Sequence, residues 1–186
     1  MKRFLVLLAG FCLIAGWVEA TTVMPFVFDG LCKTAQTVVH VRCLDNQSVV
    51  FEDRDGIFTQ TRFAVLNVVK GTVGSELVLV LPGGETEGQK MVVPGMPHFK
   101  VGQETVLFLS EPDGHGSPWP VGLGQGCYGV QFAQDGTRQV TVQTPLPPGV
   151  LSKPAQPAVV GLQDFLGMIR GAMHESESPG SEPLVK

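Results

Sequence analysis

Charged side chains are scarce in this chain of 186 residues. Lysine and arginine together number 13, aspartate and glutamate 17, and the formal net charge is −4 at pH 7. The basic residues form no block along the sequence. A concentrated basic patch is what draws a protein to nucleic acid or to an anionic membrane. We therefore expect neither of these as a partner.

Long hydrophobic runs are also lacking, with one exception at the N-terminus. The basic segment Met1–Arg3 precedes an apolar run over Phe4–Gly16, and Val18–Ala20 follows in a small-x-small pattern. This order of a basic segment, an apolar run and a cleavage site is typical of a secretory signal peptide. The apolar run is too short and wrongly flanked for a transmembrane helix. We predict a cleaved signal peptide over residues 1–20, export to the periplasm or the exterior, and a mature chain that does not span the membrane.

Cysteine is rare as well. Of the four cysteines, Cys12 falls in the predicted signal peptide, which leaves Cys32, Cys43 and Cys127. Exported proteins meet an oxidising compartment, where cysteines commonly pair. Cys32 lies on a predicted helix that leads directly into the strand holding Cys43, so we expect a Cys32–Cys43 disulfide. A Cys43–Cys127 disulfide is the alternative, because connectivity does not follow from sequence.

Histidine is equally sparse, and its spacing does not suggest a metal site. The four histidines stand at positions 40, 98, 115 and 174, in none of the HxxxH or HxH spacings by which metal ligands usually cluster. The loop Asp53–Gly56 resembles a calcium loop only faintly, since it lacks the closing glutamate. We expect neither a metal nor any other cofactor.

The sequence contains no catalytic motif in its proper context. Gly124–Gly129 matches GxGxxG, but the residues that follow alternate as a strand, whereas the dinucleotide fingerprint opens a helix. Ser117 is followed by proline and lies in no GxSxG elbow. Cys127 could form a dyad with a distant histidine, but nothing singles it out. We therefore expect a protein that is not an enzyme.

What the sequence does contain is a series of short β-type runs separated by proline and glycine clusters, most clearly between Leu79 and Val130. In the run over Thr37–Leu44, Val39, Val41 and Cys43 share one face and Val38 the other. The run over Ile57–Lys70 also alternates and is long enough to require a bend or bulge. The predicted strands cover 37–44, 49–51, 57–70, 76–81, 90–93, 104–109, 120–123, 127–133 and 138–143.

Two helices flank these strands. Apolar residues spaced by three and four predict a short helix within Pro25–Gln36 and an amphipathic helix at the C-terminal end. Many short strands at regular spacing are typical of a barrel or a sandwich. We predict a mainly β fold, a single OB-like (netrin-like) β-barrel with a helix at each end, and a β-sandwich as the alternative. The expected segments are a signal peptide (1–20), the barrel domain (21–143), a proline-rich linker (144–157), the C-terminal helix (158–173) and a disordered tail (174–186).

Aromatic residues and prolines gather in the loops of the central stretch. Aromatic side chains near loops can form a recognition surface, and they can equally close the end of a barrel. The possible binding surface consists of Pro97, His98, Phe99, Trp119, Gln125 and Tyr128.

The order of motifs along the chain resembles a group of uncharacterised bacterial exported β-barrel proteins. They share a progression of KG, PGG, GxPxF, LFL and GQGxY, and some related proteins are associated with secreted metalloprotease domains. The motifs lie in Ala35–Cys43 (AxxVVxVxC), Ile57–Gly71, Leu77–Gly84 (LVLxLPGG), Val93–Leu109 and Val121–Val130 (VGLGQGxYxV).

A weaker resemblance is to the netrin-like OB-barrel of tissue inhibitors of metalloproteinases. Those inhibitors bind the protease zinc through a cysteine at the mature N-terminus, whereas the N-terminus predicted here is Thr21. A shared fold does not carry that mechanism over. We expect a non-catalytic binding domain outside the cytoplasm, possible partners being envelope or secreted proteins such as a metalloprotease. The alternatives are a protease-associated factor or inhibitor and, third, an enzyme with its site assembled across the barrel.

Overall fold

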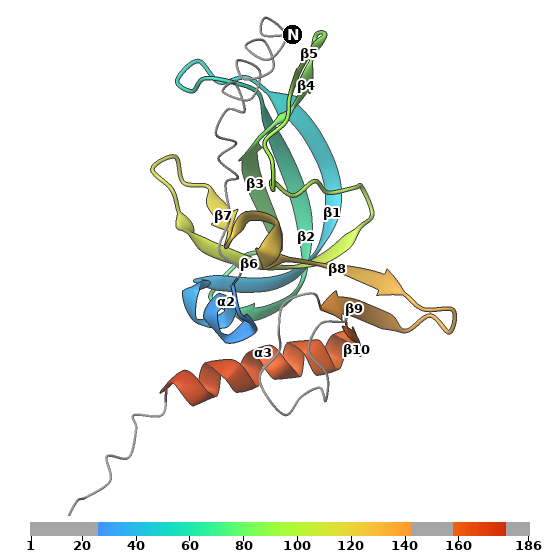
Figure 1. The fold of residues 1–186 in the computed structure, drawn as a ribbon. Coiled ribbons are helices and arrows are strands. Elements are labelled where there is room, and N and C mark those ends of the chain that lie inside the picture. Colours follow the sequence, from blue (N-terminus) through green and yellow to red (C-terminus); the bar gives the residue numbers. More distant parts are fainter. Residues whose placement is uncertain (1–25, 143–157, 178–186) are drawn as a thin grey trace, which may run out of the picture.

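The structure, a computed structural model, describes residues 26–142 and 158–177 (Figure 1). The predicted signal peptide, the predicted linker and most of the predicted tail lie outside the described residues. The main sheet contains β1 (Thr37–Val49), β2 (Phe58–Lys70), β3 (Glu76–Pro82), β6 (Glu104–Pro112), β7 (Pro118–Pro120), β8 (Cys127–Phe132), β9 (Arg138–Val142) and β10 (Ala158–Gly161). The other elements are a hairpin of β4 (Gly84–Thr86) and β5 (Gln89–Met91), the helices α2 (Phe28–Thr34) and α3 (Leu162–Glu177), and the 3₁₀ turn η1 (Leu123–Gly126).

The fold is mainly β with a helix at each end of the described chain, as predicted. The strands follow the order β10-β9-β8-β6-β1-β2-β3, with β7 paired to the second half of β6. Every pairing in the sheet is antiparallel. Among the described residues no strand pairing joins β3 to β10, so closure into a barrel is not confirmed.

The first two strands are the longest, and both are bent. The register between β1 and β2 shifts at three places, after Val38, after His40 and between Cys43 and Asp45. Such bulges insert an extra residue and increase the local twist, which lets a long strand curve. Figure 1 shows β1, β2 and β3 curving away from the helices toward the β4–β5 hairpin.

The polar residues after Cys43 belong to β1, which differs from the predicted turn at 45–48. Asn46 pairs with Thr61 of β2, and Ser48 pairs with Thr59. A run of Asp, Asn, Gln and Ser is usually a turn signal. Here cross-strand pairing outweighs that preference, and β1 continues without a break to Val49.

Two hydrophobic cores lie on opposite faces of the sheet. The helix-side core is made by α2, α3 and the facing strands, and it includes Phe28, Leu31, Val38, Phe108, Tyr128, Val140, Phe165, Leu166 and Ile169. The sheet-side core lies within the curve of β1, β2, β3 and β6, and it includes Val39, Val41, Cys43, Phe63, Leu79, Met96, Leu107 and Leu109. The predicted alternation along β1 is therefore confirmed.

Lys70, the last residue of β2, ties the sheet to helix α2. Its Nζ donates to the main-chain oxygen of Cys32 at 3.0 Å and to that of Ala35. The last carbonyls of a helix lack partners within the helix and attract a cation. The lysine of the KG turn thus fixes α2 against the end of β2.

The C-terminal helix begins later than predicted. Residues Ala158–Gly161 form β10, in which Val159 and Val160 pair with Thr141 and Val140 of β9. Branched residues such as these favour a strand when a partner edge is available. Helix α3 then runs from Leu162 to Glu177, beyond the predicted end at residue 173. The segment after the predicted linker therefore adds a strand to the same sheet.

Neither of the predicted disulfides is present, and the three described cysteines are free. Cys32 lies in the helix-side core and Cys43 in the sheet-side core, so the sheet separates them. Cys127 pairs with Leu107, whose other neighbour is Val39, four residues before Cys43. Four strand residues span about 13 Å, whereas a disulfide requires Cα atoms within about 7 Å.

No helix in the described part of the chain is long and apolar enough to cross a membrane.

Candidate functional site

The inner face of the curved sheet changes from apolar to polar along its length. Near the middle it is covered by the sheet-side core, including Cys43 and Phe63. Beyond the bulge after Cys43, the same face carries Asn46 and Ser48 of β1, opposite Thr61 and Thr59 of β2. Hydroxyl and amide groups thus continue the surface that the core residues begin.

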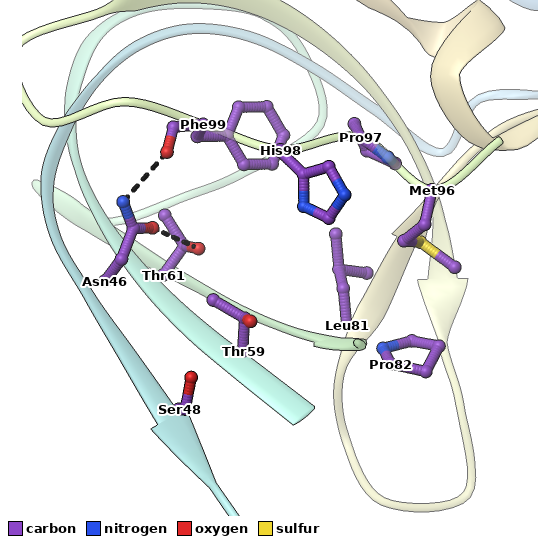
Figure 2. Close-up of a pocket in the computed structure, with 10 residues that line it drawn as sticks. All are labelled: Asn46, Ser48, Thr59, Thr61, Leu81, Pro82, Met96, Pro97, His98 and Phe99. Carbon is purple, nitrogen blue, oxygen red and sulfur yellow. Dashed lines mark hydrogen bonds between the residues drawn. The ribbon is translucent and has the colours of Figure 1, made fainter. Parts of the chain in front are cut away.

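A cavity of about 240 Å³ lies over this polar half of the face (Figure 2). The segment 96–99 forms its other wall. The lining residues are Asn46, Ser48, Thr59, Thr61, Leu81, Pro82, Met96, Pro97, His98 and Phe99. None of them carries a carboxylate, an ammonium or a guanidinium group. We call this cavity the hydroxyl pocket.

Internal hydrogen bonds hold two of the lining side chains in place. The Thr61 hydroxyl donates to Asn46 Oδ1 at 2.7 Å, and Asn46 Nδ2 donates to the main-chain oxygen of Phe99 at 2.9 Å. Both bonds are drawn in Figure 2. They link β2, β1 and the opposite wall in one chain of contacts. The amide of Asn46 is therefore oriented before any ligand arrives.

Ser48 and Thr59 each use only part of their hydrogen-bonding capacity. Ser48 Oγ accepts the main-chain N–H of Glu85 at 3.3 Å, and the Thr59 hydroxyl donates to the Gly83 oxygen at 2.7 Å. A hydroxyl has one donor and two acceptor positions. Ser48 therefore keeps its O–H for another partner, and Thr59 keeps its lone pairs. Neither residue is fully buried.

The wall formed by residues 96–99 is held in place from behind by η1. Gly95 adopts a φ of 81°, a conformation that favours glycine, and its carbonyl accepts the Gly124 N–H at 2.9 Å. Leu123 also has a positive φ, 59°, and its side chain packs against the sheet-side core. The Phe99 ring meets Phe63 edge-on with centroids 5.0 Å apart. Contacts on both sides thus fix the wall.

Three of the predicted surface residues, Pro97, His98 and Phe99, line the hydroxyl pocket. His98 is exposed at the rim, and Figure 2 shows its ring directed toward Leu81. Trp119 lies elsewhere, half-buried against the sheet-side core, with its indole N–H donating to Asp113 at 3.0 Å.

The other two predicted surface residues do not reach the pocket. Gln125 precedes β8 and accepts the main-chain N–H of Phe26 at 2.8 Å. Tyr128 is only 4% exposed and packs in the helix-side core, between the rings of Phe108 and Phe165. It lies on the opposite face of the sheet, so its assignment to a binding surface is wrong.

A second polar cluster lies on the helix-side face and is centred on Glu104, whose side chain is 1% exposed. Its carboxylate accepts from Arg42 at 2.8 Å, from Arg138 at 2.9 Å and from His40 Nε2 at 3.0 Å. We call these four residues the Glu104 cluster. Each oxygen of the buried carboxylate has partners, so the cluster is closed on itself.

The electrostatics of the Glu104 cluster follow from this geometry. Burial alone would raise the pKa of Glu104, but the hydrogen bonds from Arg138 and Arg42 outweigh it and lower the pKa to about 2. Burial lowers the pKa of His40, although the neighbouring Glu104 opposes that shift. The glutamate is thus held ionised and the imidazole neutral at pH 7. The cluster joins β1, β6 and β9.

Neither the buried Cys32 nor the half-buried Cys127 has the character of a nucleophile. Burial raises the pKa of Cys127 to about 12, and it raises that of Cys32, also to about 12. The thiolate is the reactive form of cysteine. Both side chains therefore stay protonated, and the notion of a Cys127 dyad has no support in their surroundings.

Sequence reasoning missed Asn46, Ser48, Thr59 and Thr61. A usable signal was present in β2, where Thr59 and Thr61 share a face with Phe63 in a strand whose alternation was predicted. The β1 residues carried no such signal, because the bulge after Cys43 changes which positions face inward.

No family model matches the chain, and neither does any curated protein or solved structure.

Proposed function

We propose that the chain is the non-catalytic binding domain of an exported protein, and that the hydroxyl pocket holds one small, uncharged, hydrogen-bonding group of its ligand. The observation that carries the proposal is the change from apolar to hydroxyl and amide side chains along one sheet face, at the place where a cavity lies over it. Small-molecule sites are typically concave surfaces with apolar walls and a few fixed polar groups.

The polar half of this face contributes less apolar surface to the fold than the half covered by the sheet-side core. An inward-facing Thr or Asn buries less apolar surface than Val41 of β1 and Phe63 of β2, which lie on the same face of these strands. Buried polar groups also cost free energy unless they are hydrogen-bonded. Departures from a consistent core tend to occur at functional sites. A ligand that completes the remaining hydrogen bonds gives these residues a purpose.

A partly open, OB-like barrel accounts for the curvature around the pocket, and we include it in the proposal. β7 pairs with β6, and the Val80 N–H at the free edge of β3 donates to Ser117 Oγ, just before β7, at 3.1 Å. One side-chain bond thus connects the edge of β3 with the β7 side of the sheet. The hydroxyl pocket lies beside the far ends of β1, β2 and β3, next to the β4–β5 hairpin.

The proposal is tested by nuclear magnetic resonance with four small probes at equal concentration. Methyl α-D-glucoside and N-methylacetamide are neutral hydrogen-bonding molecules, whereas acetate and methylammonium are charged. We expect at least one neutral probe to shift the amide signals of Glu85, His98 and Phe99 in a saturable manner, and the charged probes to leave them in place.

The matched variants are Asn46→Ala in the pocket and Thr141→Val on β9. Asn46→Ala should weaken the response to the neutral probe, and Thr141→Val should leave it unchanged. Saturable shifts with acetate or methylammonium alone, or no response to any probe, would show that the pocket is not a site for neutral groups.

A further inference from the structure

Building on the proposed function, we infer that the group held in the hydroxyl pocket is a single uncharged sugar unit, either free or at the end of a larger glycan. The inference rests on the kind of hydrogen-bonding groups left available, on their spacing, on the apolar walls and on the size of the cavity.

The lining favours an uncharged ligand. An ionic group loses its hydration on entering a cavity and needs an opposite charge or several donors in return. The charged pair nearest in sequence, Asp45 and Arg62, is half-exposed, and its side chains bond each other at 3.6 Å. Phosphate, carboxylate and ammonium groups therefore meet no permanently charged side chain in the lining, in which His98 at the rim is the one residue that can titrate.

The available groups combine donors and acceptors, which matches a sugar. Ser48 offers an O–H, Asn46 a second N–H, and Thr59 its lone pairs. Each hydroxyl of a sugar both donates and accepts. Ser48 and Thr59 stand directly opposite each other across β1 and β2, with Cβ atoms about 5 Å apart. Both can therefore reach neighbouring hydroxyls of one ring.

The other walls suit the C–H faces of a sugar ring. Leu81, Met96, Pro97 and Phe99 present aliphatic and aromatic surface around the polar floor. An extended peptide, by contrast, is usually bound through main-chain groups at the edge of a sheet. The polar groups here stand on the face of the sheet and belong to side chains, which favours the sugar over the peptide.

The size of the cavity limits the ligand to one unit. A volume of about 240 Å³ lies below the range of about 300–1,000 Å³ that is typical of pockets for drug-sized ligands. Asn46 and His98 are exposed at the rim, so the remainder of a longer glycan would extend into solvent.

The test measures dissociation constants by titration, followed through the amide signals of Glu85, His98 and Phe99. The probes are the methyl glycosides of glucose, galactose, mannose and N-acetylglucosamine, with glucose 6-phosphate as a charged probe and N-acetylalanine N′-methylamide as a peptide probe. At least one glycoside should bind saturably and more tightly than the other two probes. The variant with Ser48→Ala and Thr59→Val should bind it roughly ten-fold more weakly, because two hydrogen bonds are lost.

The outcomes separate this inference from the proposed function. Binding of the peptide probe at the same amides, with no glycoside bound, overturns the sugar inference and leaves a neutral-group site in place. Tighter binding of glucose 6-phosphate than of every glycoside also overturns it. If no probe moves these amides, both proposals fail. Thr141→Val is the control, and equal weakening in that variant would show that the effect is not local to the pocket.

Discussion

Two polar clusters flank the same strand, and they use their hydrogen-bonding groups differently. In the Glu104 cluster, two arginines and a histidine surround a buried carboxylate, and both of its oxygens have hydrogen-bond partners. In the hydroxyl pocket, uncharged side chains surround a cavity and keep donors and acceptors in reserve. A cluster closed on itself contributes to the stability of the fold. A cluster with unused capacity around a cavity is suited to binding.

Strand β1 contributes two residues to each cluster, so the Glu104 cluster and the hydroxyl pocket can be compared on the same strand. His40 and Arg42 face the helices, whereas Asn46 and Ser48 face the inside of the curve. The register shift between Cys43 and Asp45 separates the two pairs. If this comparison is correct, substitutions in one cluster should affect stability and substitutions in the other should affect binding.

The largest effect on stability is expected for Glu104→Gln. The neutral amide cannot replace the charge that Arg42 and Arg138 surround, and it leaves fewer acceptor positions for them. Breaking a buried ion pair costs about 3–5 kcal/mol. Because the two arginines are half-exposed and can turn to water, we expect the free energy of unfolding to fall by about 3 kcal/mol. Equilibrium unfolding in urea measures it. A loss below about 0.5 kcal/mol would mean that the cluster does not hold the sheet together.

Acid should destabilise the protein through the same cluster. The pKa of Glu104 is about 2 in the fold, against an ordinary value of 4.5, so its contribution is complete above pH 4.5 and is lost as the pH falls through 2. The pKa of His40 lies below 6.5 in the fold, so proton uptake below that pH favours the unfolded chain. Urea unfolding between pH 7 and 2 should show stability falling toward acid. Glu104→Gln should flatten the fall between pH 4.5 and 2, and an unchanged slope would contradict the assignment.

Ser117→Ala should have a smaller effect, because it removes the single bond between Ser117 and Val80. Leaving a buried main-chain N–H without a partner costs about 1–3 kcal/mol. Because Val80 lies on an edge strand, we expect the free energy of unfolding to fall by about 1 kcal/mol. Hydrogen exchange at the Val80 amide should accelerate while the amides of β6 stay protected. The control is Ser75→Ala, an exposed serine just before β3. Equal effects of the two substitutions would remove the argument for a partly open barrel.

The smallest effect on stability is expected for Ser48→Ala. Its bond to the Glu85 amide is long, 3.3 Å, and exposed, and surface substitutions usually change stability by less than about 0.5 kcal/mol. Thermal unfolding should therefore be nearly unchanged, whereas binding of the neutral probe should weaken. A marked drop in stability would place Ser48 among the residues that maintain the fold.

The sequence was sufficient to predict the elements whose pattern is local. The alternation in β1 and β2 and the three–four spacing in α2 and α3 each depend on one continuous stretch. The start of α3 was misplaced because β10 depends on a partner, β9, that precedes it along the chain. Long-range pairing of that kind leaves no mark in the helical spacing of the residues around Leu162.

The two polar clusters were harder to predict for different physical reasons. Glu104 opens a strand as an ordinary charged residue. Its partners gather around it only through the pairing of β1 with β6, of β6 with β8 and of β8 with β9. The pocket residues Asn46 and Ser48 resemble a turn, and a bulge hides the side to which they point. The place of Tyr128 in the helix-side core was not predictable, because the alternation along β8 does not reveal which face of the strand meets the helices.

The most direct test of the central claim is a crystal structure of the protein soaked in methyl α-D-glucoside at high concentration. We expect a sugar ring in the hydroxyl pocket, with its oxygens within hydrogen-bonding distance of Ser48 Oγ and Thr59 Oγ1. The Glu104 cluster should be unchanged. A pocket filled by the protein's own side chains, or a ligand bound at Arg42 and Arg138 instead, would contradict the account.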